Sequence, residues 1–296
     1  MQKIAQMERE AGLDEVLYLM SCREGIGSVY EHLMVKELFQ GLINDYSINR
    51  VLTLGCECAR GLDNVAFCFN RPCEVILIDP SLKVLEGSPL LAFPSVQDKV
   101  STLESNLSQT SLDDSSMFDV VWNFAVIQQY DDPQVILREM VRLSRKLVVV
   151  FVPNARNIGK IFHTVYHLLS QTECHHAERG YKKWMLLENL EKEFPKAGLK
   201  IIGNGYIDIP PFPDIAASLK EWRELFFKPK SNPVDKNTGT YQVPDISLEN
   251  AHTKVGRIKK LANVIEKRSR FRSMRFLEKH AAHHMYIVGE ITDAKQ

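Results

Sequence analysis

Short apolar runs alternate with amphipathic segments through the middle of the chain. The apolar runs have the length of buried strands and lie at 51–55, 74–79, 100–105, 118–124 and 146–152, with further ones at 199–209 and 284–291. Segments with helical spacing lie between the first five, over 61–70, 81–91 and 133–144. This alternation predicts an α/β fold with right-handed crossovers and a mostly parallel sheet.

Further helix signals lie before the first strand and at the start of helix 133–144. Residues 3–21 and 29–45 carry apolar side chains at helical spacing, which predicts two helices before the first strand. These helices either lean over a ligand cleft or simply pack on the sheet. Helix 133–144 has Pro133 in its first turn and Asp132 as its expected cap.

The strand ends predict a ligand cleft, because ligands of such sheets lie beyond the carboxyl ends of the strands. The residues selected by this rule are Gly55, Cys56, Glu57, Asp79, Pro80, Ser81, Asn106, Leu107, Asn123 and Phe124. Asp79 is suited to accept hydrogen bonds from two ribose hydroxyls, although it also suits a helix cap. The side-chain carbonyl of Asn106 can accept a hydrogen bond from the amino group of a nucleoside base. Asn123 either meets the ligand or serves as a turn residue.

The loop after the first strand limits the ligand that fits there. A dinucleotide fingerprint needs Gly-x-Gly-x-x-Gly, and a phosphate loop needs Gly-x-x-x-x-Gly-Lys-Ser/Thr. Here glycine stands only at Gly55 and Gly61, and Glu57 would place a carboxylate beside a pyrophosphate. A cationic nucleoside without phosphate fits better.

Successive motifs resemble those of the class I S-adenosylmethionine-dependent methyltransferases. The run Val51-Leu-Thr-Leu-Gly-Cys56 looks like the first motif of that family, and Val75-Ile-Leu-Ile-Asp79 looks like the second. Later segments, Phe118-Asp-Val-Val-Trp-Asn123 and Leu147-Val-Val-Val-Phe-Val-Pro-Asn154, are similar to its fourth and fifth strands. The order and spacing of these motifs agree with the family pattern over about residues 50–154, and the pattern resumes at 184–210 and 283–291.

The resemblance implies a doubly wound, mostly parallel seven-stranded sheet with an antiparallel last strand and helical cap insertions. The predicted core comprises 49–154, 184–210 and 281–296. Residues 1–48 are expected to form an N-terminal helical cap, and 155–183 and 211–280 to form helical lid insertions.

The resemblance also implies S-adenosylmethionine as the cofactor and methyl transfer to an O-, N- or C-nucleophile of a small-molecule acceptor. The first motif departs from the family pattern: Thr53 replaces an acidic residue, and Glu57 and Ala59 replace glycines. The alternative is therefore a non-catalytic, methyltransferase-like interaction protein with a basic cap surface. The missing second glycine disfavours a nicotinamide-dependent oxidoreductase.

Three residues are candidates for contacting the acceptor. His163 and His167 stand one turn apart on a predicted helix, and Tyr130 follows the fourth strand. Histidine titrates near neutrality, so either one is suited to act as a general base. With the later Cys174, His175 and His176 they also form a metal alternative, but the spacing of zinc knuckles is absent and we assign no metal.

The segment 254–279 is strongly basic, with ten Lys and Arg against Glu266 and Glu278. Such a charge excess can attract an anionic acceptor. The alternative is an amphipathic cap helix with a solvated basic face. We expect no nucleic-acid partner, and the pattern leaves a homodimer open.

Composition agrees with an enzyme-sized chain of 296 residues that is 45% hydrophobic and 25% charged. No apolar run approaches a membrane span and the N-terminus lacks the apolar core of a signal peptide, so we expect a cytoplasmic protein. The cysteines are Cys22, Cys56, Cys58, Cys68, Cys73 and Cys174. Without knuckle spacing, we predict reduced, buried thiols.

Overall fold

The computed structural model describes residues 11–21, 26–56, 64, 67–68, 73–86, 88–113, 117–170, 182–209, 247–269 and 275–292. Among the predicted residues, Glu57, Ala59 and Gly61 lie outside these ranges, as do Cys22, Cys58, Cys174, His175 and His176. The predicted helix 61–70 is described only at residues 64, 67 and 68.

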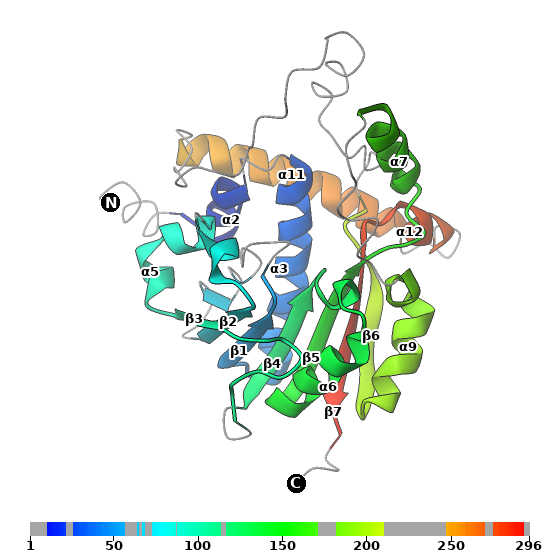
Figure 1. Cartoon of the computed structure of the whole chain (residues 1–296). Helices are drawn as coiled ribbons and strands as arrows, with labels where there is room; N and C mark the ends of the chain where they lie inside the picture. Colours follow the sequence, from blue (N-terminus) through cyan, green and yellow to red (C-terminus); the bar gives the residue numbers. More distant parts are fainter. Residues whose placement is uncertain are drawn as a thin grey trace.

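A seven-stranded sheet in the order β3-β2-β1-β4-β5-β7-β6 forms the centre of the molecule (Figure 1). Its strands are β1 Arg50–Leu54, β2 Glu74–Asp79, β3 Val100–Glu104, β4 Phe118–Phe124, β5 Ser144–Pro153, β6 Leu199–Ile207 and β7 His284–Ile291. The first five strands pair in parallel, whereas β7 is antiparallel to both β5 and β6. The predicted sheet, including its antiparallel last strand, is confirmed.

Helices cover both faces of the sheet (Figure 1). On one face lies α3 Ile26–Tyr46, against which α2 Leu13–Ser21 packs, and on the other lie α6 Pro133–Leu143 and α9 Leu187–Lys196. Alternate residues of each central strand enter the two cores, so that Val149 packs with α3 and Val148 packs with α6 and α9. Both residues are fully buried, which explains why residues 147–153 of β5 form an unbroken apolar run.

The aromatic centre of the core shows how α3 is held on the sheet. The Phe39 ring lies 4.7 Å from Trp122 of β4 and 5.8 Å from Phe151 of β5, measured between ring centroids. All three side chains are buried, and such ring pairs add to the free energy gained by burial. Of the two predicted N-terminal helices, α3 therefore packs on the sheet, whereas α2 packs on α3 and α11.

The segment after β2 differs from the prediction of one helix over 81–91. It forms two short 3-10 turns, η2 Leu82–Leu85 and η3 Pro89–Ala92, followed by the four-residue helix α5 Pro94–Gln97. Proline lacks a backbone N–H and its ring clashes with the preceding helical turn, so Pro89 and Pro94 each begin a new element. The prediction of a single helix over 81–91 was therefore wrong, because Pro89 interrupts a stretch whose apolar residues have helical spacing.

Helix α6 confirms its predicted cap. The Asp132 side chain accepts a hydrogen bond from the backbone N–H of Gln134 at 3.0 Å, and Pro133 occupies the first turn. Between β4 and α6 the chain makes one 3-10 turn, η4 Ile127–Gln129.

Three helices lie beyond the carboxyl ends of β4 and β5 (Figure 1). They are α7 Gly159–Ser170, α11 Leu248–Ser269 and α12 Arg275–Ala281, and the 3-10 turn η5 Lys182–Met185 precedes α9. This is the edge at which the lid prediction places them. Closure over a pocket, and the division into core, cap and lid, stay predictions.

Helix α11 packs on α2 through the buried side chains of Val255 and Ile258. Asp14 of α2 accepts a hydrogen bond from Lys36 at 2.8 Å and also pairs with Lys259 of α11. The described part of α11 is therefore an amphipathic helix, and the charge of at least one of its lysines is neutralised by Asp14.

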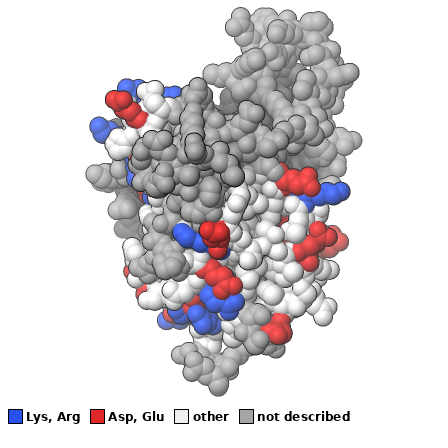
Figure 2. All heavy atoms as spheres, turned by 90° about the vertical axis from the view of Figure 1, so that its left-hand side faces the viewer, with Lys and Arg blue, Asp and Glu red and all other residues white. Residues whose placement is uncertain are grey.

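The face of the molecule on the β3 side shows basic and acidic side chains next to one another (Figure 2). No helix of the described chain is long and apolar enough to cross a membrane.

Candidate functional site

Gly55 turns the chain sharply at the carboxyl end of β1. Its φ of +80° is rarely adopted by L side chains, and a Cβ built there would lie 2.6 Å from Cγ1 of Val126. Its backbone N–H donates to the carbonyl of Ile78 at 2.7 Å, which ties the turn to β2. Only glycine fits this position, because both the backbone angle and the space exclude a side chain.

Asp79 joins the loops that follow β1 and β2. Its Oδ2 accepts a hydrogen bond from the backbone N–H of Cys56 at 2.8 Å, and its Oδ1 accepts one from Ser81 at 3.0 Å. The side chain is buried. An ionised carboxylate has about four lone-pair sites, so these two donors orient Asp79 and leave it capacity to accept from a ligand. Ser81, and not Asp79, is the N-cap residue of the 3-10 turn η2, so the cap role of Asp79 was wrong and its ligand role stays a prediction.

Asn123 fixes the next loop along the sheet. Its Nδ2 donates to the carbonyl of Leu54 at 2.5 Å, and its Oδ1 accepts from the backbone N–H of Ile127 at 2.9 Å. The side chain is fully buried. Asn123 thus holds the end of β1 against the loop that places Val126 over Gly55, and a ligand contact from its side chain stays a prediction.

The remaining strand-end residues are arranged less uniformly. Asn106 is exposed, and its Oδ1 accepts from the backbone N–H of Ser108 at 2.9 Å and from the Ser108 hydroxyl at 2.8 Å. Leu107 beside it is fully buried, and Pro80 is exposed. Asn106 therefore closes a turn after β3, and its adenine contact stays a prediction.

The middle of the chain matches a known protein family over the residues that build these loops. Residues 52–152 match the family described as a methyltransferase domain. The match covers about a third of the chain and supports a class I methyltransferase. The match supports S-adenosylmethionine as the cofactor, in agreement with the sequence motifs.

Solved structures resemble this chain at low sequence identity. A protein of Galdieria sulphuraria, described as a sarcosine dimethylglycine methyltransferase, has a TM-score of 0.50 at 10% identity, covering 87% of this chain and 85% of that one. The complex of the Haloferax volcanii Trm112 methyltransferase activator with a methyltransferase has a TM-score of 0.49 at 15% identity, covering 95% of this chain and 98% of that one. No curated protein sequence matches the chain significantly.

The residues predicted to contact an acceptor are only partly described. Tyr130 is half-buried and packs against the core formed by α6 and α9. His163 and His167 lie on α7, as predicted, but their side chains are outside the described part of the structure. Contact of these three residues with an acceptor stays a prediction.

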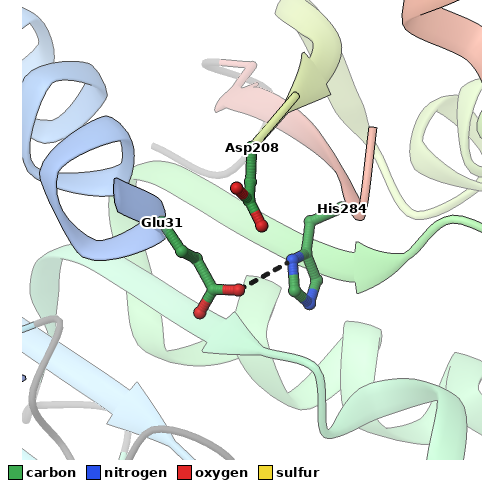
Figure 3. A group of neighbouring side chains, drawn as sticks. All are labelled: Glu31, Asp208 and His284. Carbon is green, nitrogen blue, oxygen red and sulfur yellow. Dashed lines mark ion pairs between the residues drawn. The ribbon is translucent and has the colours of Figure 1, made fainter. Parts of the chain in front are cut away.

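A carboxylate–histidine cluster at the same edge of the sheet was missed by the sequence reasoning. It consists of Glu31 on α3, Asp208 after β6 and His284 at the start of β7, which Figure 3 shows, together with His283 just before β7. Nδ1 of His284 lies 3.2 Å from Oε2 of Glu31, and Nδ1 of His283 lies 2.8 Å from Oδ2 of Asp208. The paired histidines before the last strand were visible in the sequence, but nothing there connected them with Glu31.

The cluster is electrostatically unusual. Burial raises the pKa of Asp208 and the negative charge of Glu31 raises it further, against the hydrogen bond with His283. Burial also disfavours ionisation of Glu31, but the positive charge of His284 and the contact with it lower the pKa of Glu31 below its ordinary value. The two carboxylates therefore have pKa values displaced in opposite directions, which is typical of functional sites.

The described thiols confirm the prediction of reduced, buried cysteines for Cys56, Cys68 and Cys73. Burial raises the pKa of Cys68 and of Cys73 to about 12, and burial together with the charge of Asp79 raises the pKa of Cys56. The thiolate is the nucleophile, so we expect all three to resist alkylation by iodoacetamide at pH 7.5 in the native protein. Peptide mass mapping before and after denaturation measures this, and rapid native labelling of any of the three would contradict the described burial.

Proposed function

We propose that the protein transfers a methyl group from S-adenosylmethionine to a small-molecule acceptor at the carboxyl edge of its sheet. The observation that carries the proposal is the arrangement of Gly55, Asp79 and Asn123. The turn at Gly55 follows β1, the buried carboxylate of Asp79 stands at the end of β2, and the loop held by Asn123 follows β4. They lie together at the carboxyl ends of these strands. This is the edge at which doubly wound sheets bind nucleosides.

The cofactor would lie across the ends of β1 and β2. Asp79 would accept hydrogen bonds from the ribose hydroxyls, held in position by the N–H groups of Cys56 and Ser81. The absence of a second glycine disfavours a pyrophosphate and leaves a phosphate-free cation as the better ligand. Pro80, Asn106, Leu107 and Phe124 would complete the pocket.

The acceptor would lie beyond β4 and β5. Methyl transfer from a sulfonium to a nucleophile needs the two held in line and water excluded, and it does not require a strong catalytic group. Helices α7, α11 and α12 lie at this edge, where they would cover the acceptor. Ile161 and Leu168 of α7 are 62% and 76% exposed and would supply an apolar wall of that cover. The basic residues of α11 would favour an anionic acceptor, and we expect the enzyme to act in the cytoplasm.

A second function is favoured by the same exposed residues of α7. Exposed apolar side chains on one helix also suit a protein partner, so a non-catalytic interaction protein remains the alternative. The two proposals differ in whether the cofactor binds.

Calorimetric titration with S-adenosylhomocysteine tests the proposed function. We expect one site per chain with micromolar affinity, because the N–H groups of Cys56 and Ser81 orient the Asp79 carboxylate. NAD⁺ is the matched control and should not bind, since its pyrophosphate needs the glycines that this loop lacks. Absence of S-adenosylhomocysteine binding at millimolar concentration would reject the enzyme and favour the interaction protein.

A further inference from the structure

Three potential metal ligands meet at the carboxyl edge of β5, β6 and β7. Glu31, Asp208 and His284 each offer a ligand atom, and these atoms all lie within 4.8 Å of one another. Figure 3 shows the two carboxylates and the imidazole turned toward one common point. Each residue comes from a different element, so the fold itself brings them together.

Asp208 supplies an independent indication that something binds at this point. Its side chain is only 2% exposed, and its Oδ1 accepts no hydrogen bond from the described residues. A buried carboxylate oxygen without a donor is costly, so such atoms are nearly always satisfied by a partner or an ion. The cluster therefore has an acceptor position that the protein leaves open.

The orientation of Asp208 is fixed by its neighbours. Its Oδ2 faces Nδ1 of His283 at 2.8 Å, and its backbone carbonyl accepts from the His283 N–H at 2.9 Å. The Asn154 N–H in turn donates to the carbonyl of His283 at 2.7 Å, which anchors this pair to the end of β5. Metal-ligating carboxylates are typically held by a second hydrogen bond of this kind.

His284 is held from the other side by packing. The Phe124 ring lies 5.0 Å from the His284 ring, measured between centroids, and the backbone of His284 pairs with Pro153 and Ile207. Its Nδ1 faces Glu31 at 3.2 Å. The imidazole therefore points into the space between the two carboxylates (Figure 3).

We propose that Glu31, Asp208 and His284 bind a divalent transition-metal cation, Mn²⁺ or Zn²⁺. Two carboxylates and one imidazole provide oxygen and nitrogen ligands, which Mn²⁺ and Zn²⁺ both accept. Ca²⁺ prefers oxygen ligands alone, and soft metals such as Cu⁺ prefer thiolates. A bound dication also neutralises two carboxylates that otherwise face each other in a poorly hydrated place. Metal–ligand bonds of about 2.0–2.2 Å require the three groups to move slightly closer.

Three protein ligands leave coordination positions for water or for an oxygen atom of another molecule. The site lies at the same sheet edge as the proposed acceptor pocket, and Phe124 connects it to the end of β4. A metal there would hold an acceptor through its oxygen atom. This role rests on the proposed function, whereas the metal site itself does not.

Titration of the metal-stripped full-length protein with Mn²⁺ tests the proposal, with free Mn²⁺ followed by electron paramagnetic resonance. We expect one site per chain with a Kd in the micromolar range, from which equimolar Zn²⁺ displaces Mn²⁺. Glu31→Gln, Asp208→Asn and His284→Ala should each weaken binding at least tenfold. Glu31→Gln is the most informative of these variants. Glu31 is the less buried of the two carboxylates, so its substitution disturbs the fold least.

His252→Ala is the matched control. His252 and Glu15 form another histidine–carboxylate pair, 2.7 Å apart, in which the His252 side chain is 79% exposed. Removing it should leave Mn²⁺ binding unchanged, which separates a built site from general histidine and carboxylate affinity. Circular dichroism melting shows whether each variant is folded before its affinity is interpreted.

Absence of a micromolar Mn²⁺ or Zn²⁺ site in the wild-type protein would overturn the proposal and identify the cluster as an ion-pair network. Equal Mn²⁺ affinity in folded Glu31→Gln and wild-type protein would overturn it as well. These titrations contain no cofactor, so they fail independently of the S-adenosylhomocysteine titration. Metal binding without cofactor binding would reject the methyltransferase proposal alone.

Discussion

Replacing Asp119 by alanine is expected to lower the free energy of unfolding by about 3–5 kcal/mol, the cost of removing one partner from a buried charge network. Asp119 is fully buried at the start of β4. Its Oδ2 accepts from the backbone N–H groups of Asn49 at 2.8 Å and Arg50 at 3.0 Å. Its Oδ1 pairs with Arg145 at 2.8 Å and Lys146 at 2.9 Å. One carboxylate therefore joins β1, β4 and β5 at their amino ends.

The same network predicts how stability depends on pH. Burial disfavours the charged form of Asp119, but the hydrogen bonds from Arg145, Lys146 and the backbone outweigh it and hold the pKa well below the ordinary value. A depressed pKa means that the stabilisation is fully present above the unfolded pKa of about 4 and is lost as the pH falls toward the folded value. Wild-type stability should therefore fall more steeply with acid than that of Asp119→Ala.

Urea denaturation of both proteins between pH 7 and pH 3 measures this difference. Glu74→Gln is the matched control, because Glu74 pairs with Arg50 at the same edge but is 49% exposed. Exposed pairs contribute little, so its unfolding free energy should change by less than about 1 kcal/mol. Equal unfolding free energies of wild type and Asp119→Ala at pH 7 would show that Asp119 does not stabilise the contact between the amino ends of β1, β4 and β5.

Replacing Asp79 by alanine is expected to weaken S-adenosylhomocysteine binding by about 1.5–3 kcal/mol, roughly 10- to 150-fold in Kd. The substitution removes the carboxylate expected to accept from the ribose. It also removes the acceptor of the Cys56 and Ser81 N–H groups, so the loop after β1 loses its connection to β2. Both effects reduce affinity, and Asp79→Asn separates them because an amide oxygen can still accept one hydrogen bond.

Calorimetry on Asp79→Ala, Asp79→Asn and Glu74→Gln decides the assignment. Glu74 lies at the amino end of the same strand, so its substitution should leave the cofactor Kd unchanged. The expected order of affinity is wild type and Glu74→Gln, then Asp79→Asn, then Asp79→Ala. If Asp79→Ala folds normally and keeps the wild-type Kd, the nucleoside lies elsewhere and the role of Asp79 is limited to joining two loops.

Local pattern was sufficient for most of the sheet. Strands β2, β4 and β7 have the predicted bounds, because each is a continuous apolar run bordered by polar residues. Helix α6 was also predicted with its cap, since Asp132 and Pro133 act within one turn. The failure at 81–91 came from the same local rules, because the apolar spacing favoured one helix although Pro89 lies within it.

The two sites differ in how much of them the sequence determined. Gly55 and Asp79 each stand at the end of a predicted strand, and the parallel sheet brings successive strand ends to one edge, so the sequence by itself predicted that these loops meet. Glu31, Asp208 and His284 lie on a helix, on a loop and on the antiparallel strand, and no periodicity connects them. Only the packing of α3 across the sheet, and the pairing of β7 between β5 and β6, decided that these side chains meet, because their contacts join residues distant in the sequence.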